Sequence, residues 1–167
     1  IKFGDSGEPP TFWHQGDTGW RGYLTSAQYP RVINPANNRL WTANSRVVGD
    51  KMLQKIGNGG YALGARAKQI RDDLLALTTF DEQALLAIGL DDNALFLKRW
   101  QTFLLKQVLT PQALAKHKQF VEIKTLLDKQ PMVQASSDSV SYRLVRNFRA
   151  NVRNLVFSQL NDTLKNI

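Results

Sequence analysis

The stretch NPANNRLWTANSRVVGD, residues 34–50, combines asparagines with residues that favour strands. Its first eleven residues include four asparagines, whose side chains favour turns by bonding to nearby backbone. Trp41, Val47 and Val48 have the aromatic or β-branched side chains that favour strands. Asn44 stands past the turn, inside the part with strand propensity. The stretch therefore predicts a turn followed by a strand that carries a side-chain amide.

The sequence around this stretch has two halves of different character. Residues 1–60 are rich in Gly, Pro, Asn and Trp, and the glycine-rich run at 57–60 breaks regular structure. We expect loops with one or two strands there. From residue 61 to residue 167, apolar side chains recur every three or four positions, as in amphipathic helices. The predicted fold class is mainly α with a short β/loop N-terminal part, the two together forming one compact domain fragment.

The first two predicted helices follow the glycine-rich run. One spans residues 61–77, with its apolar side chains on a single face. The next is predicted to start with a capping box, in which Thr79 accepts a hydrogen bond from the amide of Glu82 and Glu82 reaches back. Gly89 is expected to end this helix because glycine readily adopts the conformation that closes a helix.

Three further helices complete the chain. The third follows Asp91 and Asp92, whose charges suit the positive end of a helix dipole. The fourth is predicted to span 110–130, because a threonine at 110 followed by a proline at 111 is typical of a helix start. The last is predicted over about 140–164.

Composition excludes several kinds of site. The 167 residues suffice for one domain, and 43% are hydrophobic, enough for a sizeable core. There are no cysteines, which excludes disulfides, thiolate metal sites and a cysteine nucleophile, and which suits a periplasmic or secreted protein. His14 and His117 are the two histidines and stand far apart, so no histidine metal site is predicted. No run approaches the roughly 18 apolar residues of a membrane span.

The formal net charge of +8 raises the question of an anionic partner. Arg143, Arg146, Arg149 and Arg153 fall on one face of the last predicted helix. This stripe suits either a basic module that binds nucleic acid or a structural role, in which it is a solvated helix face or pairs with acids on a neighbouring segment. We favour the structural role, because aromatic residues do not interleave with the arginines as in single-strand binders. Nucleic acid is therefore the alternative partner, and no membrane partner is expected.

Asn44 is the main candidate for chemistry. A preorganised side-chain N–H can stabilise an oxyanion in a dry site, worth about 3 kcal/mol in the transition state. Arg66, near the start of the first predicted helix, is the candidate to orient that amide, because a guanidinium donates hydrogen bonds from a rigid fork. The alternative is that the asparagine-rich stretch is only a turn.

At this point the sequence resembles the penicillin acylase (penicillin amidase) family. The family has a Pro-x-Val-x-Asn-Pro turn followed by a strand reading roughly Thr-Ala-Asn-Asn, and a Trp-x-Gly element before the turn. Helical stretches later in the chain are also similar, in the same order. The segments that carry the resemblance are GWRGYL, YPRVINPANNRLWTANSRVVGD, YALGARAKQIRDDL, LLAIGLDDNALFLKRWQTFLL and YRLVRNFRANV.

The resemblance implies an N-terminal nucleophile hydrolase that cleaves an amide bond. In that family, self-cleavage of a precursor frees a serine at the start of the β chain, and the α-amino group of that serine acts as the base. An acyl-enzyme forms and is then hydrolysed. Asn44 matches the asparagine that holds the oxyanion, and Arg66 matches the arginine beside it. Ser45 stands where many members have a second asparagine.

The resemblance also sets expectations for the parent protein. Its fold is a four-layer αββα sandwich, and this chain, which begins with Ile1 rather than serine, looks like part of the β chain. The expected partners are the remainder of the acylase, namely the α chain and the N-terminal part of the β chain. The substrate is a penicillin, a cephalosporin side chain or an N-acyl homoserine lactone. Some members bind calcium, but position 55 is Lys55 here, so no cofactor is predicted from this segment.

Overall fold

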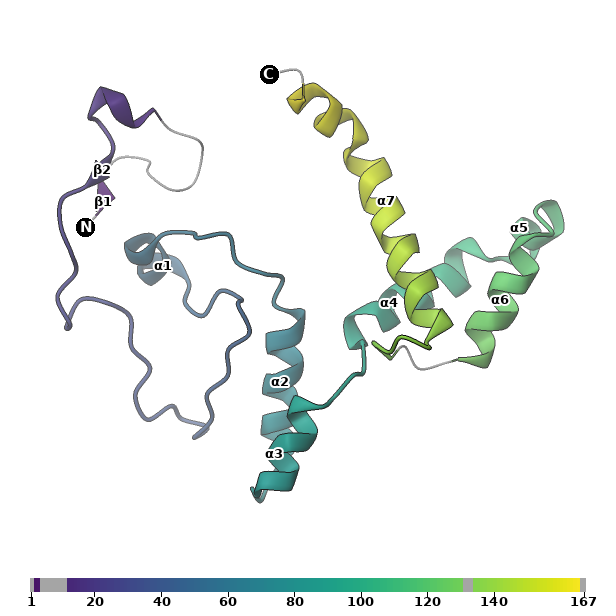
Figure 1. Cartoon of the computed structure of the whole chain (residues 1–167), viewed down its shortest axis with the longest axis horizontal. Coiled ribbons are helices and arrows are strands. Elements are labelled where there is room, and N and C mark those ends of the chain that lie inside the picture. Colours follow the sequence, from purple (N-terminus) through teal and green to yellow (C-terminus); the bar gives the residue numbers. More distant parts are fainter. Residues whose placement is uncertain (1, 4–11, 131–133, 166–167) are drawn as a thin grey trace. The chain divides into compact units, whose positions relative to one another are not determined.

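The computed structural model describes residues 2–3, 12–130 and 134–165, and Figure 1 shows the elements along the chain. The contacts divide the chain into two units, Ile1–Ile88 and Gly89–Ile167. Helices account for most of the regular structure, so the mainly α prediction is confirmed.

The first unit opens with a short antiparallel pair of strands. β1 (Lys2–Phe3) pairs with β2 (Gly19–Trp20), with Lys2 opposite Trp20. A single turn of 3-10 helix, η1 (Trp13–Gln15), lies between them in the sequence. The expectation of one or two strands in the N-terminal half is met by these two, but not where the strand propensity was highest.

The strand predicted around Trp41–Val48 was wrong. Residues 41–49 contain bends and irregular backbone, and Asn44 has a φ of 59°, in the left-handed region. A single strand is not stable unless a neighbour satisfies its backbone hydrogen bonds. Among the described residues no segment pairs with this one as a strand. The strand propensity of Trp41, Val47 and Val48 is therefore not enough to produce a strand here.

Two helices follow in the first unit. α1 (Asp50–Ile56) was not predicted from the sequence, and Gly57, with a φ of 79°, ends it. α2 (Ala65–Ala76) begins four residues later than predicted. The irregular residues before it contact the stretch at 34–49, which we call the asparagine-rich loop. The amide of Ala62 donates to the carbonyl oxygen of Asn44 at 2.9 Å, which holds residue 62 outside the helix.

The N-terminal cap of helix α3 (Glu82–Gly89) differs from the predicted one. The amide of Ala84 donates to Oδ1 of Asp81 at 2.7 Å, so Asp81 caps this helix and the predicted Thr79 box is wrong. Aspartate is as good a cap as threonine, and it is one residue from the start of the helix. Gly89 ends the helix as predicted.

The second unit is built from helices. α4 (Leu95–Phe103) continues directly into a π-helical turn, η2 (Leu104–Val108). The amide of Leu109 bonds to the carbonyl of Leu104 at 2.9 Å across that turn. The wider turn brings Leu104 and Leu109, five residues apart, into the same core, where they are 6% and 4% exposed.

The predicted helix over 110–130 is divided in two, α5 (Pro111–Lys116) and α6 (Phe120–Lys129). Its start was right, because Oγ1 of Thr110 accepts from the amide of Ala113 at 3.3 Å. At the break the amide of Phe120 donates to the carbonyl of His117 at 3.0 Å, and Phe120 packs against the core. No proline or glycine marks this break in the sequence.

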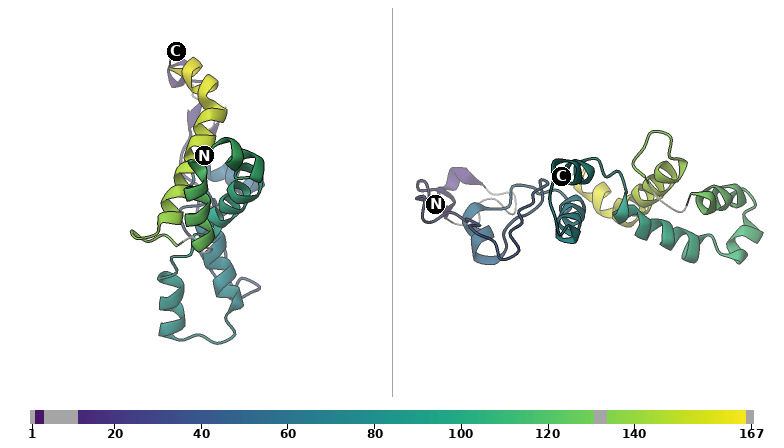
Figure 2. Two further views of the ribbon diagram at one scale, coloured as in Figure 1. Left: turned by 90° about the vertical axis from the view of Figure 1, so that its right-hand side faces the viewer. Right: turned by 90° about the horizontal axis from the view of Figure 1, so that it is seen from below.

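The long helix α7 (Val140–Leu164) has the predicted bounds. It packs against α4 and α6, as Figures 1 and 2 show. Leu127 of α6 and Val145 of α7 are fully buried where these helices meet. Nε2 of Gln101, on α4, donates to the carbonyl of Gln130 at 3.0 Å, which links α4 to the end of α6.

Candidate active site

The structure brings Asn44 and Arg66 together across 22 residues of sequence. Nη2 of Arg66 donates to Oδ1 of Asn44 at 2.7 Å, and the same nitrogen donates to the carbonyl of Ala43 at 3.2 Å. Arg66 is the second residue of α2, so the first turn of that helix presents it to the loop. A single nitrogen makes both contacts, rather than the two arms of a fork.

This pairing fixes the orientation of the Asn44 amide. Arginine carries only donors, so the atom that faces it must be the amide oxygen rather than the nitrogen. The two N–H groups of Nδ2 are therefore turned away from the guanidinium. An amide held in this way presents donors in a fixed direction, as an oxyanion site requires.

The backbone of Asn44 is also held in place. Its carbonyl accepts from the amide of Ala62, and its φ of 59° is one that asparagine adopts more readily than most residues. The loop is thus attached to the segment before α2 through main chain and to α2 itself through Arg66. The amide lies on a bend instead of on the strand that sequence propensity predicted.

Arg39 is a site residue that sequence reasoning missed. Its Nε donates to the carbonyl of Leu74 and its Nη2 to that of Leu77, both at 3.3 Å. These carbonyls belong to the C-terminal end of α2, where helices have unpaired acceptors. The Arg39 guanidinium also lies 4.1 Å from the ring centroid of Phe80. The asparagine-rich loop is therefore held at both ends of α2, by Arg66 at the start and by Arg39 at the end.

A basic hollow lies next to Asn44 in the sequence and in space. Its volume is about 350 Å³, and its lining includes Ser45, Arg46, Lys68 and Arg71. Hydrogen bonds from Lys68 and then from Arg71 lower the pKa of Asp72, the carboxylate that pairs with both. Asp72 thus offsets part of the positive charge on this side of α2.

Both Asn44 and Arg66 are exposed to solvent in this chain. An oxyanion donor is worth most where water is excluded, because the surrounding dielectric is then low. The described residues supply the hydrogen bond that joins the pair, but they leave both side chains open to water.

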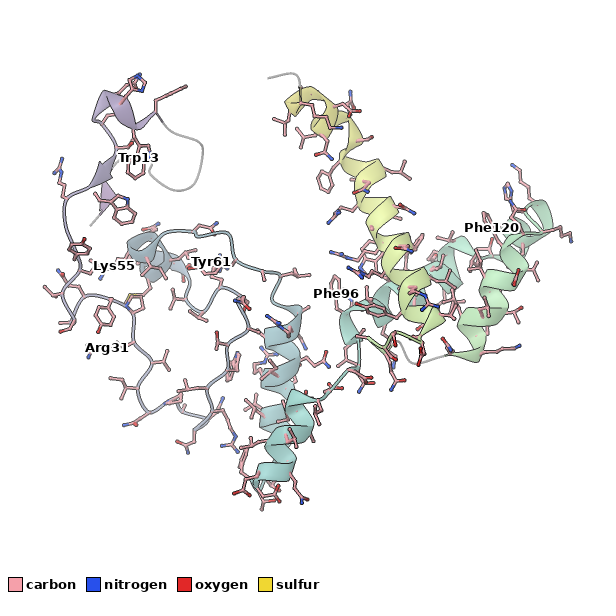
Figure 3. All side chains as sticks on the ribbon, viewed as in Figure 1. Trp13, Arg31, Lys55, Tyr61, Phe96 and Phe120 are labelled. Carbon is pink, nitrogen blue, oxygen red and sulfur yellow. The ribbon has the colours of Figure 1, made fainter. Side chains whose placement is uncertain are left out.

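The other candidate residues do not join this site. His14 makes an edge contact with Phe12 at 5.7 Å between ring centroids, and His117 lies beside Phe120 at 5.5 Å. Lys55 lies on α1, as Figure 3 shows. Within the described ranges, no three His, Asp or Glu side chains gather as metal ligands would. The expectation that this segment holds no cofactor stays a prediction.

In the part of the chain that the structure describes, no helix combines the length and the apolar character that a membrane span requires.

Comparison with known protein families matches the family model described as Penicillin amidase over residues 4–166. No curated protein and no solved structure matches the chain. The family match takes in the asparagine-rich loop, α2 and the helices of the second unit. It thus includes both members of the Asn44–Arg66 pair and nearly every residue of the sequence. The chain belongs to the penicillin amidase family.

Proposed function

We propose that this chain is part of an amide hydrolase and supplies the side-chain donor that stabilises the oxyanion. The observation that carries the proposal is the 2.7 Å hydrogen bond from Nη2 of Arg66 to Oδ1 of Asn44. It turns Nδ2 of Asn44 outward as a donor. Family membership gives that donor a chemical context, because the family includes amidases.

In the proposed reaction, the α-amino group of a serine takes the proton of its own hydroxyl, and the hydroxyl oxygen attacks the carbonyl carbon of a linear amide. The carbonyl oxygen becomes negatively charged, and Nδ2 of Asn44 donates to it. The C–N bond then breaks, the amine leaves with the transferred proton, and water hydrolyses the acyl-enzyme. We propose that the serine is the N-terminal residue of a β chain and lies outside these 167 residues. On this proposal the 167 residues are inactive by themselves.

Arg66 acts as a positioning residue in this proposal. Its positive charge also polarises the Asn44 amide, because a donor bound to the amide oxygen makes the amide N–H groups stronger donors. The remainder of the acylase would cover the exposed pair and exclude water. The proposed substrates are penicillins or other N-acyl amides, with acyl-homoserine lactones as the alternative within the family, and the proposed location is the periplasm or the extracellular space.

Substitution of Asn44 in the intact acylase tests the proposal. Asn44→Ala removes the donor, and kcat should fall about 10²–10³-fold towards a chromogenic N-acyl anilide. Asn44→Asp keeps an oxygen for Arg66 but places a negative charge near the oxyanion, so it should be at least as inactive while remaining folded.

Asn38→Ala is the matched control. Asn38 lies in the same loop and has a φ of 50°, so the substitution imposes a similar backbone cost. It should leave kcat within about twofold of the wild type, because it removes no donor from the site. Equal losses of activity in the Asn38 and Asn44 variants would show that Asn44 is a turn residue only, and the proposed function would fail.

The position of the nucleophile has its own test. N-terminal sequencing of the mature acylase should find a chain that starts with serine and contains these 167 residues. A mature protein without such a chain would remove the serine mechanism, whatever the Asn44 variants show.

A further inference from the structure

The apolar side of α7 continues past the part that the other helices cover. Residues three or four apart form a continuous line along this helix, which we call the α7 apolar stripe: Val145, Phe148, Val152, Val156, Leu160 and Leu164. Val145 is fully buried, whereas Val156, Leu160 and Leu164 are 69%, 54% and 57% exposed. The C-terminal half of α7 extends beyond α4, α5 and α6 in Figures 1 and 2.

A hollow of about 450 Å³ lies where the stripe leaves the core. Phe96, Arg99, Trp100 and Phe103 of α4 line it together with Val152 of α7. Phe96 lies on the part of α4 that passes α7, as Figure 3 shows. The hollow is mostly apolar and is large enough for a bulky side chain.

Arginines surround this hollow without acidic partners. The guanidinium of Arg149 lies 5.0 Å from the ring centroid of Phe96 and 6.0 Å from that of Trp100. Among the described residues, neither Arg149 nor Arg99 forms an ion pair with a carboxylate. α7 itself carries four arginines and one acid, Asp162. The surface thus combines an uncovered apolar stripe with unmatched positive charge.

We propose that this surface binds an acidic amphipathic segment of another polypeptide. Apolar side chains of the segment would cover Val156 and Leu160, and one bulky side chain would enter the hollow. Carboxylates beside that side chain would pair with Arg99 and Arg149. This is the helix-in-groove mode of recognition, with arginine pairing to set the orientation.

Other occupants fit the surface less well. A second copy of this chain would bring like charges together, because each copy carries +8. Nucleic acid would neutralise the arginines but would leave the apolar stripe in water. A lipid surface would accept the stripe, but the hollow between α4 and α7 suits a protruding side chain better than a flat interface.

The test uses the whole 167-residue chain and a designed probe. The probe is a fluorescein-labelled helical peptide of Leu, Phe and Glu in amphipathic order, and its control has Gln in place of every Glu. Fluorescence anisotropy should show that the Glu peptide binds at least about tenfold more tightly than the Gln peptide at low salt. Equal binding of the two peptides would overturn the proposal.

Matched variants locate the binding. Leu160→Asp should weaken binding of the Glu peptide about tenfold, whereas Asn161→Asp, the same change of charge off the stripe, should weaken it less than threefold. Arg99→Gln should weaken binding, and the neighbouring Lys98→Gln should not. Circular dichroism checks that each variant keeps its helix content, so a loss of binding is not a loss of fold.

Two competing measurements complete the design. Labelled duplex DNA and phosphatidylglycerol vesicles are titrated under the same conditions. If either ligand binds more tightly than the Glu peptide does, and if Leu160→Asp weakens its binding by the same factor, the proposal is overturned in favour of nucleic acid or membrane. Weaker binding of both, with the peptide pattern above, supports it.

Discussion

At the scale of single residues, the sequence predicted that Asn44 and Arg66 belong to one site but did not predict the backbone conformation that carries Asn44. The resemblance placed the two residues in one site, and the structure joins them by a hydrogen bond. The backbone that carries Asn44 was predicted as a strand and is a left-handed bend. The hydrogen-bonding roles of Asn44 and Arg66 could be predicted from their residue types. A strand, in contrast, needs a neighbouring strand to pair with, and the local sequence does not show whether one is present.

Arg66→Lys tests whether the direction of the guanidinium matters. Lysine keeps the positive charge but has a flexible ammonium in place of a rigid, planar donor group. We expect kcat of the intact acylase to fall about tenfold with little change in KM, because the asparagine amide would lose its fixed orientation. Steady-state kinetics checks this, and unchanged kcat would show that Arg66 is only a solvated helix residue.

Arg39→Gln tests the second attachment of the loop. Without the bonds to the end of α2, the loop should open more often, and the amide of Ala62, which is bonded to Asn44, should exchange faster with deuterium. We expect an increase in exchange rate of about tenfold by NMR. Arg31→Gln is the control, because the Arg31 guanidinium lies over the ring of Tyr29 rather than on α2. Equal effects of both changes would contradict this role for Arg39.

At the scale of elements, local signals gave several helix boundaries, although Asp81 rather than the predicted Thr79 caps α3. Thr110 followed by Pro111 marked the start of α5, and the period of apolar residues gave the bounds of α7. The sequence could not show that α5 and α6 are separate helices. No proline or glycine marks that break, and Phe120, which begins α6, packs against a core assembled from residues distant in the sequence.

The ion pairs of α2 give this helix a dependence on pH. Hydrogen bonds from Lys68, and then from Arg71, hold the pKa of Asp72 below its usual value near 4. A lowered folded-state pKa means that the stabilisation is present above the unfolded value and is lost as the pH falls through the folded one. Asp72→Asn should therefore lower the melting temperature at pH 7 and have no effect once the carboxyl group is protonated.

A double-mutant comparison checks the cause of that effect. Lys68→Gln removes the contact that lowers the Asp72 pKa most. At pH 7, adding Asp72→Asn to Lys68→Gln should change the melting temperature less than Asp72→Asn alone does. Additive effects of the two substitutions would show that the pair is not coupled, as is common for exposed ion pairs.

At the scale of the whole molecule, the described residues leave much apolar side-chain area in water. Each of the two units has large apolar residues with at least 70% of their area exposed, among them Tyr23 in the first unit and Leu90 and Leu155 in the second. The hydrophobic content predicted a sizeable core, but much of it lies on the surface.

That exposed apolar surface predicts how the chain behaves alone. We expect the 167 residues by themselves to bind the dye ANS and to unfold over a broad temperature range, because little of the apolar surface is buried cooperatively. Within the intact acylase the same residues should bind no dye, because the remainder of the protein would cover them. ANS fluorescence and calorimetry on the chain and on the intact protein make this comparison. A sharp, two-state calorimetric transition of the isolated chain without dye binding would show that its fold needs no further polypeptide, and the proposed covering of Asn44 and Arg66 would then have to come from the substrate.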